Sequence, residues 1–420
     1  MSPRKPLEGV YVLDMTQVWA GPMVTRMLAS FGATVIKIEG PTRPDTLRTL
    51  GWDLPQRFPD GDRGLDPENR NAWFNTQNHG KLGVLLDIRA PEGLALVERL
   101  AQRCQVLVSN SRSGAMAKLG LGYDRYRELR GPDAVVAEMS AFGATGERAK
   151  LAGFGLQFEA AAAGPWLIGD EQPVLTGYAV ADAVGGVATA GAIMTAVLHA
   201  RRTGIGSYID ASLVEAYLST MGDVVLEATL GQNVIDRYGA NRHPGAAPHG
   251  IFPVGDGRWL AVGVHTDQQW QALVKVSADP TIAAPEWASA DDRERHIAPL
   301  HVAVAQWTKA QPDAARLEAL LQDVGVPAAV VATAADVARN PFLASTDYYA
   351  EVTHPSTGTH RYPGLPYSVD GRHLAPGSPA PCWGEHTDQV LSGLLGLDEA
   401  ELADLADRGI IGRSDAAFPE

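Results

Sequence analysis

The sequence predicts an α/β protein whose larger domain is a Rossmann-like, doubly wound parallel sheet, accompanied by a smaller α+β domain. Two observations support this fold class. Short apolar runs typical of buried strands alternate with helical segments through roughly the first 140 residues. The first such unit is complete: a strand at 10–14, a helix at 22–30 with Pro22 in its first turn, and a second strand at 34–39.

The same alternation continues through the rest of the larger domain. The segment 40–71 is rich in Pro, Gly, Asp and Arg, and a connection of this length without secondary structure is typically functional. Further strands are expected at 84–88, 105–109 and 134–139, with a helix at 90–103. The larger domain is expected to cover residues 1–224.

The sequence changes in character near residue 225. Two apolar runs flank Gly255-Asp256-Gly257, which is typical of the turn of a β-hairpin. The hairpin strands are expected at 250–254 and 258–264, and helices at 267–276, 296–308 and 313–324, so 225–330 is predicted to form the smaller domain. Residues 331–420 are expected to be a linker, with coil at 353–381, and a C-terminal segment, helical at 387–395 and 398–408, that returns to the larger domain.

Composition limits the classes of partner. The chain of 420 residues has 45% hydrophobic and 20% charged residues, which is ordinary for a globular protein. Its 35 basic and 49 acidic side chains give a net charge of −14, so nucleic acid and anionic membranes are poor partners. No apolar run approaches the roughly 20 residues that span a bilayer, and no signal-type segment follows the basic start.

Cysteine and histidine usage indicates neither a disulfide framework nor a metal centre. The two cysteines, Cys104 and Cys382, form no CxxC pair, and the 11 histidines lack ligand spacing. Few cysteines and no export signal predict a cytoplasmic protein.

One acidic residue stands at the start of the most distinctive helix. Asp182 opens a run that is otherwise apolar and rich in Gly and Ala as far as His199, and two arginines and a glycine end it. The helix N-terminus is expected to hold this carboxylate ionised, with the backbone N–H groups of Gly185 and Gly186 beside it. A nucleophilic carboxylate needs that environment. The alternative is a structural role, because Asp is also a preferred N-cap residue.

Several familiar nucleotide and hydrolase motifs are absent. The first strand, turn and helix imitate a dinucleotide site, with Glu39 where an acid could bind a ribose. However, the GxGxxG fingerprint is missing, and Pro22 removes a backbone donor that a pyrophosphate would use. No GxxxxGK[ST], HExxH or GxSxG sequence occurs either.

Six groups of residues, in order along the chain, resemble the class III coenzyme A transferases, the family of formyl-CoA transferase and carnitine CoA-transferase. Each match is short, and their specificity comes from the order in which they follow one another along nearly the whole chain. The matching residues are Gly9-Val10, Val12–Asp14, Ala20–Pro22, Gly32-Ala33 and Val35–Glu39; Asn78, Gly80-Lys81, Leu86-Asp87 and Pro91–Gly93; Asn110–Gly114 and Leu119–Tyr123; Phe142-Gly143 and Gly146; Ala181-Asp182, Gly185-Gly186, Arg202–Gly204, Gly206, Asp210, Ser212 and Glu215-Ala216; and Gly384–Thr387, Val390-Leu391 and Leu394–Leu397.

The resemblance implies that Asp182 is the catalytic residue of an acyl-CoA:carboxylate CoA-transferase. Asp182 would attack the donor thioester, and the resulting mixed anhydride would become an aspartyl-CoA thioester from which the acceptor acid takes CoA. Backbone N–H groups around Gly185 and Gly186 would stabilise the negative charge that develops on oxygen. CoA is then a substrate, and no other cofactor or metal is expected.

The resemblance also places the CoA molecule. The nucleotide is expected near Asn110 and Lys118, and the thiol arm along the turn formed by Val18, Trp19 and Ala20.

Other basic residues are weaker candidates for the CoA phosphates. Arg43 and Arg48 lie in the loop after the second predicted strand, and Lys81 is a further candidate; for each, the alternative is a solvated surface charge. Two positions depart from the family's pattern. Trp19 stands where some members have Gln, which predicts a more apolar acceptor pocket, and Gly155 stands where many have an acid.

Two alternatives remain open. The α-methylacyl-CoA racemases share the fold and the aspartate, but they need two proton carriers about the α-carbon, and the corresponding positions fall near Phe154 and Thr266. The second alternative is a catalytically idle CoA-binding subunit of a heteromeric transferase. The family is known for interlocked homodimers, so one is expected here. The sequence leaves the exchanged acids open, with succinyl-CoA a donor by analogy.

Overall fold

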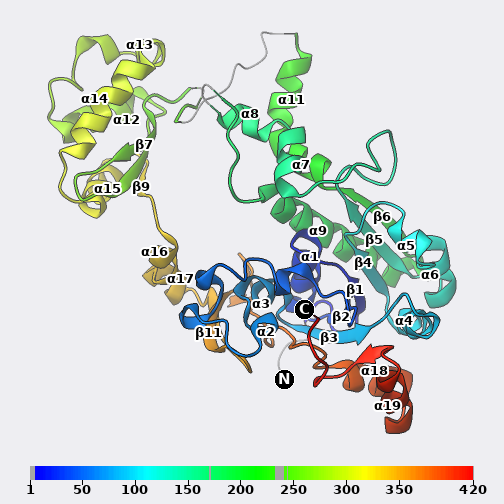
Figure 1. The fold of residues 1–420 in the computed structure, drawn as a ribbon. Coiled ribbons are helices and arrows are strands. Elements are labelled where there is room, and N and C mark those ends of the chain that lie inside the picture. Colours follow the sequence, from blue (N-terminus) through cyan, green and yellow to red (C-terminus); the bar gives the residue numbers. More distant parts are fainter. Residues whose placement is uncertain (1–4, 170–171, 232–240, 244, 420) are drawn as a thin grey trace. The chain divides into compact units, whose positions relative to one another are not determined.

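A seven-stranded sheet organises the larger part of the chain (Figure 1). The computed structural model describes residues 5–169, 172–231, 241–243 and 245–419. The strand order is β14-β3-β2-β1-β4-β5-β6, and neighbours are parallel except β14, which is antiparallel to β3. The strands are β1 (Tyr11–Met15), β2 (Thr34–Glu39), β3 (Lys81–Leu86), β4 (Val106–Ser109), β5 (Val135–Ser140), β6 (Ser207–Ser212) and β14 (Ile411–Gly412). From β1 the strands are added first on one side, as β2 and β3, and then on the other, as β4, β5 and β6. This reversal of strand order confirms the predicted doubly wound class and creates a switch point between β1 and β4.

The chain divides into two compact units. The larger comprises Met1–Ala162, Thr176–Met221 and Pro341–Glu420, and the smaller comprises Ala163–Leu175 and Gly222–Asn340. Besides its sheet, the larger unit contains α1 (Ala20–Ser30), α2 (Pro67–Arg70), α3 (Ala72–Asn78), α4 (Pro91–Arg103), α5 (Ala115–Lys118), α6 (Tyr123–Arg130), α7 (Gly155–Ala161), α9 (Val180–Thr203), α10 (Leu213–Leu218), α17 (Pro341–Ser345), α18 (Thr387–Leu395), α19 (Glu399–Asp407), and the hairpin strands β10 (Tyr349–His354), β11 (Gly358–Pro363), β12 (Ser368–Val369) and β13 (Arg372–His373).

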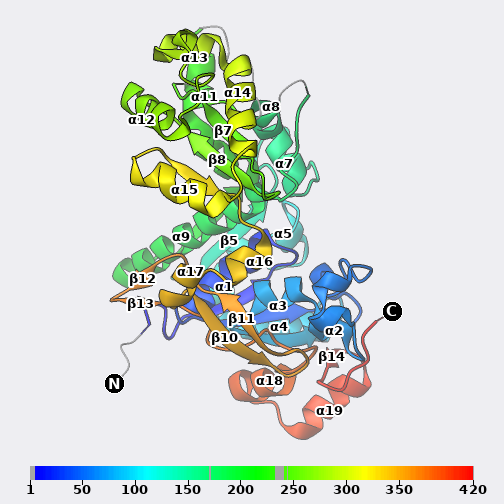
Figure 2. The same cartoon turned by 90° about the vertical axis from the view of Figure 1, so that its left-hand side faces the viewer.

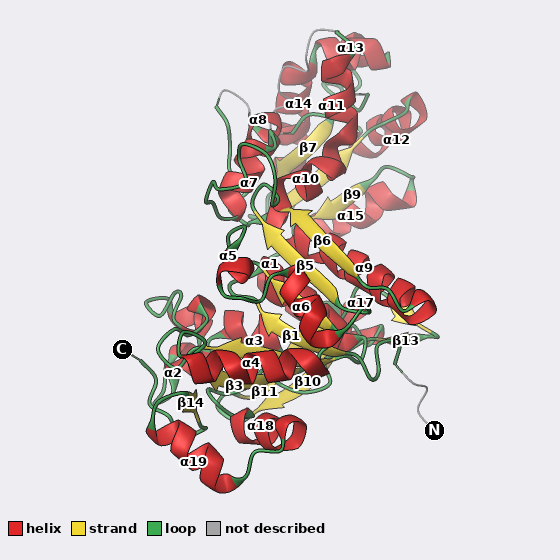
Figure 3. Ribbon diagram, turned by 90° about the vertical axis from the view of Figure 1, so that its right-hand side faces the viewer, coloured by secondary structure: helices red, strands yellow, loops and turns green. Residues whose placement is uncertain are grey.

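Alternate residues of the sheet face opposite layers of helices. Val12 and Val35 join α1 and α9 in one core, whereas Leu13 and Ile36 pack with α4, α18 and α19 in the other. Figure 3 shows α4 lying across the strands of this second face. Because both faces are buried, the strands appear in the sequence as continuous apolar runs.

The smaller unit is built on an antiparallel sheet of β7 (His249–Pro253), β8 (Trp259–Gly263) and β9 (Ala328–Val330). The predicted hairpin is present as β7 and β8, and Gly257 in its turn has a φ of 82°. Helices complete the unit, with Trp270, Leu300 and Leu317 in its core. They are α8 (Gly164–Ile168), α11 (Gly222–Thr229), α12 (Asp267–Ser277), α13 (Ala290–Arg295), α14 (Ile297–Lys309), α15 (Ala314–Asp323) and α16 (Ala334–Ala338).

Three segments differ from the sequence prediction. The connection 40–71 contains short helical turns, including α2, and the predicted coil at 353–381 contains hairpin strands. Figure 2 shows the β10–β11 hairpin beside α3, where the rings of His79 and Tyr362 are 6.1 Å apart. Strand β6 is absent from the prediction because its mixed polar and apolar residues lie at the half-exposed edge of the sheet.

Helix α9 corrects one expectation from composition. An 18-residue window within it has a mean hydropathy of 1.6, so by length and composition alone the helix could cross a bilayer. The helix does not stand out in the sequence as an apolar run, because Gly, Ala and Thr occupy many of its positions. In the described structure 44% of that window is buried, and α9 contributes Ala190 and Ile193 to the core of the larger unit. These are properties of a core helix.

Two glycines provide a matched test of this packing. A Cβ at Gly206 would lie 1.8 Å from the carbonyl oxygen of Ala134, whereas a Cβ at Gly191 on α9 would meet no atom within 4 Å. Gly206→Ala is expected to lower the free energy of unfolding by about 1–3 kcal/mol because the β5–β6 edge must shift. Gly191→Ala is expected to raise it by about 0.5–1 kcal/mol because Ala favours a helix. Urea unfolding followed by circular dichroism measures both, and equal effects would contradict this packing.

Candidate active site

The turn between β1 and α1 has a strained residue at its centre. Val18 has a φ of 66°, a region that β-branched residues rarely adopt. Its N–H donates to Asp45 Oδ1 at 3.0 Å. The neighbouring Gln17 pairs with the Asn110 amide, donating its N–H at 2.8 Å and accepting at its carbonyl at 2.7 Å. A Cβ at Gly21 would lie 2.8 Å from Asn110 Cγ, so only glycine allows this close approach.

Buried ion pairs lie beneath the turn. Lys37 Nζ is 2.9 Å from Asp45 Oδ2 and donates to the Thr16 carbonyl at 2.8 Å. Lys81 Nζ is 3.0 Å from Asp14 Oδ2. Burial lowers the pKa of Lys81 to about 8, although Asp14 opposes the shift. Because a buried charge that loses its partner is strongly destabilising, these pairs make the geometry of the turn costly to change.

Asp182 lies in the first turn of α9 and is not its N-cap. The N-cap is Ala179, whose side chain makes no capping bond. Glu159, fully buried on α7, accepts from the Ala181 N–H at 3.3 Å and from Thr176 Oγ1 at 2.7 Å. The structural alternative for Asp182, an N-cap residue, is therefore wrong, because Glu159 serves the start of the helix.

The surroundings of Asp182 disfavour its charge. Burial, and then the negative charge of Glu159, raises the pKa of Asp182 to about 6. Among the described residues its carboxylate has no hydrogen-bond donor. The expectation that the helix N-terminus favours the charged form of Asp182 is corrected, because burial and Glu159 raise its pKa and the Ala181 N–H is bonded to Glu159. At neutral pH the carboxylate is still mostly ionised, and it is poorly solvated.

A glycine makes room for this carboxylate. A Cβ at Gly155 would lie 2.1 Å from Asp182 Oδ2 and 2.2 Å from Ala179 Cβ. The departure from the family's pattern at Gly155 therefore has a physical cause, since α7 approaches the first turn of α9 too closely for any side chain here.

A cavity of about 260 Å³ connects Asp182 with the strained turn. It lies where the carboxyl ends of β1, β4 and β5 meet the first turn of α9, which is where ligands bind in open α/β sheets. The residues around it include Gln17, Val18, Asn110, Ser111, Arg112, Ser113, Ser140, Phe154, Phe158, Asp182 and Leu213.

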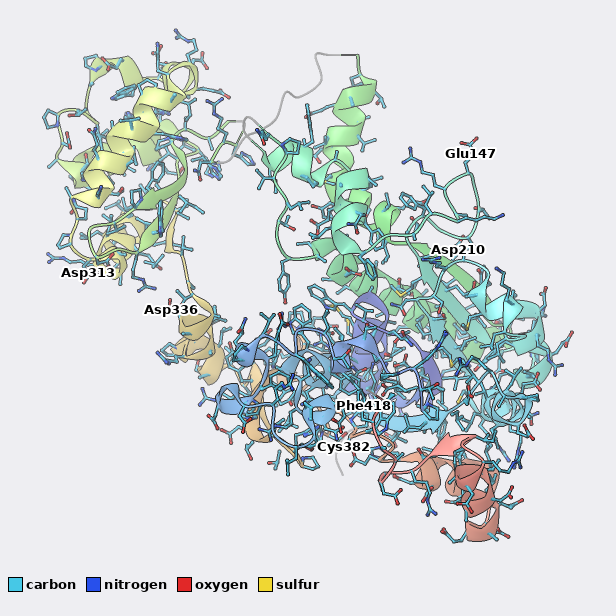
Figure 4. All side chains as sticks on the ribbon, in the orientation of Figure 1. Glu147, Asp210, Asp313, Asp336, Cys382 and Phe418 are labelled. Atoms are coloured by element: carbon cyan, nitrogen blue, oxygen red, sulfur yellow. The ribbon has the colours of Figure 1, made fainter. Side chains whose placement is uncertain are left out.

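The loop between β5 and α7 forms one wall of this cavity. Leu151 and Gly153 of the loop line it. Both carboxylate oxygens of Asp210 on β6 accept from the Ala144 N–H, at 2.8 and 2.9 Å, and fasten the start of the loop. Figure 4 labels Asp210 on β6 and Glu147 at the outer end of the loop.

A second, mostly apolar recess of about 190 Å³ shares Val18 with the cavity. Trp19, Trp73 and Tyr178 form its walls, and the rings of Trp19 and Tyr178 meet edge to face at 4.8 Å. Gln77 also lines it, and its buried Oε1 has no hydrogen-bond partner among the described residues. An apolar recess with one free polar atom is typical of a site for a small organic group.

Two of the residues predicted to contact CoA line the cavity or a space beside it, and a third is exposed to solvent. Asn110 lines the cavity, and Arg43 lines an adjoining space of about 180 Å³ that shares Gln17 and Ser111 with it. Lys118 is exposed at the end of α5. Of the predicted thiol-arm residues, Val18 and Trp19 line the recess.

Ala20, the third residue predicted along the thiol arm, is buried at the start of α1. It contributes its backbone there, because its carbonyl oxygen faces the close approach of α9 at Gly186.

Arg48 is corrected as a phosphate partner. Its guanidinium is fully buried, donates to both carboxylate oxygens of Glu39 at 2.8–3.2 Å, and lies 3.7 Å from the centre of the Phe74 ring. Lys81 is likewise buried and paired with Asp14. Sequence alone does not distinguish a loop arginine that turns inward from one that faces solvent.

Gly185 and Gly186 are also corrected. Both lie inside α9, so their N–H groups are used in the helix and are not available to an oxyanion. Close packing accounts for them: a Cβ at Gly185 would lie 2.2 Å from Leu213 Cδ2, and one at Gly186 would lie 3.0 Å from the Ala20 carbonyl oxygen.

Sequence reasoning missed Asp45 and Glu159. An acid within the otherwise largely apolar helix α7 is the one feature of the sequence that could have drawn attention to Glu159. Its role could not be predicted from that, because its hydrogen-bond partners lie outside α7. At the positions of the two racemase bases, Phe154 lines the cavity and Thr266 caps α12 through its hydroxyl. Within the ranges that the structure describes, no group of three His, Cys, Asp or Glu side chains is placed to hold a metal.

These features define an α/β enzyme fold with a carboxylate at the switch point of its sheet. The sequence model of CoA-transferase family III matches residues 7–387. The chain therefore belongs to CoA-transferase family III, as the resemblance predicted.

The chain is similar to named members of this family along nearly its whole length. It is 30% identical over 415 residues to succinyl-CoA–D-citramalate CoA-transferase of Chloroflexus aurantiacus, covering 97% of this chain and 99% of the relative. It is 31% identical over 392 residues to succinyl-CoA:mesaconate CoA-transferase of Haloarcula marismortui, covering 92% and 95%. The crystal structure of a CaiB/BaiF family protein from Brucella suis matches with a TM-score of 0.82 at 27% identity, covering 93% and 100%. The protein is a CoA-transferase that uses CoA thioesters as substrates.

The raised pKa of Asp182 predicts a cost in stability. Its folded-state pKa of about 6 lies above the ordinary value of 3.8, so ionisation destabilises the folded state. Asp182→Asn is expected to raise the free energy of unfolding at pH 7 by roughly 1–3 kcal/mol. The advantage should shrink as the pH falls from 6 to 4 and vanish below 4, where both states bind the proton. Urea unfolding of both proteins across pH 4–8 measures this, and a pH-independent difference would contradict the burial of the charge.

Proposed function

We propose that this enzyme moves CoA from a donor acyl-CoA to a free carboxylic acid through a covalent intermediate on Asp182. The observation that carries the proposal is a carboxylate that faces a cavity at the switch point of the sheet and has no hydrogen-bond donor among the described residues. The names of the relatives support succinyl-CoA as the first candidate donor.

The steps balance without any proton transfer. A carboxylate oxygen of Asp182 attacks the thioester carbonyl, the C–S bond breaks, and CoA leaves as a thiolate while a mixed anhydride of Asp182 and the donor acid forms. The thiolate then attacks the Asp182 carbonyl carbon, so the donor acid leaves as a carboxylate and an aspartyl-CoA thioester remains. The acceptor carboxylate attacks this thioester, and the released thiolate takes the acceptor acyl group and frees Asp182. Each nucleophile and each leaving group is an anion.

The cavity and the recess divide the substrate between them. The CoA nucleotide lies toward Asn110 and Arg43, with the exposed Lys118 as a further candidate phosphate partner. The acyl group enters the recess beside Trp19 and Trp73, whose indole rings favour an apolar or aromatic portion. Val18 lines both spaces, which supports a position for the reacting carbonyl next to it.

The two alternatives are less well supported. A racemase requires proton carriers on both sides of the α-carbon, and Phe154 at the cavity has none. An idle CoA-binding subunit has no need for a carboxylate kept poorly solvated beside the cavity. The interlocked homodimer and the cytoplasmic location stay predictions from the resemblance and the composition.

Chemical trapping tests the nucleophile. Wild-type protein incubated with succinyl-CoA and then hydroxylamine should carry a hydroxamate on Asp182 in peptide mass spectrometry, because hydroxylamine cleaves the activated acyl bond. Asp182→Asn should lose the adduct and at least 1,000-fold of the exchange rate, a loss on the order expected when a covalent nucleophile is removed.

The matched control is Asp124→Asn, which removes an exposed carboxylate from α6 and should leave exchange unchanged. CoA binding by calorimetry should persist in both variants. Undiminished exchange by Asp182→Asn would overturn the proposal.

A further inference from the structure

We propose that Glu159 is a positioning residue for Asp182: its buried carboxylate fixes the first turn of α9 and keeps a negative charge beside the nucleophile. This inference rests on the proposed role of Asp182 in the transfer reaction.

Glu159 is held in place by contacts with two other segments. It is fully buried on α7. One oxygen accepts from the Ala181 N–H at 3.3 Å, and the other accepts from Thr176 Oγ1 at 2.7 Å. Thr176 Oγ1 is also 2.8 Å from the Tyr178 carbonyl. These contacts join the residue that precedes Asp182 to the segment that leads into α9. They therefore fix the backbone from which the Asp182 side chain extends.

The charge of Glu159 has no cationic partner among the residues that the structure describes, in contrast with the buried carboxylates beneath the β1–α1 turn. Tyr217 of α10 faces Glu159. The pKa of its hydroxyl is raised, mainly by burial and to a lesser extent by the charge of Glu159. From the segment before α9, the neutral hydroxyl of Thr176 faces it. The charge that acts on Asp182 is that of Glu159.

Helix α7 is arranged so that this charge reaches Asp182. Gly155 and Glu159 are four residues apart and therefore share one face of α7. The glycine lets the helix approach the Asp182 carboxylate, since any Cβ at 155 would lie 2.1 Å from Oδ2. No side chain from position 155 stands between the two carboxylates.

The effect on the reaction follows from charge. Free Asp182 is an anion next to another anion, whereas the mixed anhydride and the aspartyl-CoA thioester are neutral at this position. Acylation therefore relieves the repulsion, and Glu159 favours the covalent intermediate relative to the free enzyme. It also makes the carboxylate a stronger nucleophile, because nucleophilicity rises with basicity.

Glu159→Gln separates the charge from the structural contacts. The amide keeps an oxygen to accept from a neighbouring donor but removes the negative charge. The acid limb of kcat/KM for CoA exchange is expected to move to lower pH by roughly one unit. At pH 8 the exchange rate should fall about threefold, and less Asp182 hydroxamate should be trapped at a fixed succinyl-CoA concentration.

Glu215→Gln is the matched control, because Glu215 is an exposed acid on the neighbouring helix α10. Its acid limb should coincide with that of the wild type. A folded Glu159→Gln protein whose acid limb also coincides with wild type would overturn the inference, even if its activity is lower. If wild-type Asp182 forms no hydroxamate, the proposed function fails instead, and that result does not depend on any variant of Glu159.

Discussion

The hydrogen bond from the Val18 N–H to Asp45 is the constraint on which the site depends. A β-branched residue with positive φ costs of the order of 1–3 kcal/mol and persists only where its surroundings fix it. Asp45 is fully buried and is itself held by Lys37, which also binds the Thr16 carbonyl. The turn therefore keeps one shape, and both the cavity and the recess take their common wall from it.

The second constraint is the close approach of α9 to its neighbours. Small residues on α9 let α1 and α10 come near, so Gly186 meets the Ala20 backbone and Gly185 meets the Leu213 side chain. This packing brings the first turn of α9 to the carboxyl end of the sheet. The glycines that suggest an anion site in the sequence thus serve close packing, and they position the helix that carries Asp182.

The sequence was sufficient for the order of the elements, and it failed where a property depends on contacts between distant segments. Buried parallel strands and glycine stops are local, so β1 to β5 could be recognised, whereas the edge strand β6 lacks that pattern. Asp182 could be selected as a candidate by its place in an ordered set of motifs, and its catalytic role stays a proposal. The direction of its pKa shift could not be predicted, because Glu159 comes from another helix. Arg48 illustrates the same limit, since its ion pair with Glu39 decides its role.

The raised pKa of Asp182 matches the energetic problem of transferring a thiol group. A thiolate with a pKa of about 8.5 is a poorer leaving group than a carboxylate, so attack on a thioester by an ordinary aspartate is uphill. With the pKa of Asp182 at about 6 rather than 3.8, the gap in basicity between this proposed nucleophile and the leaving thiolate is roughly halved. Hydrogen-bond donors around the carboxylate would widen that gap again by stabilising the anion. A site for carboxylate nucleophiles therefore gains from burial and a neighbouring acid, the reverse of the donor-rich surroundings that suit an anion-binding site.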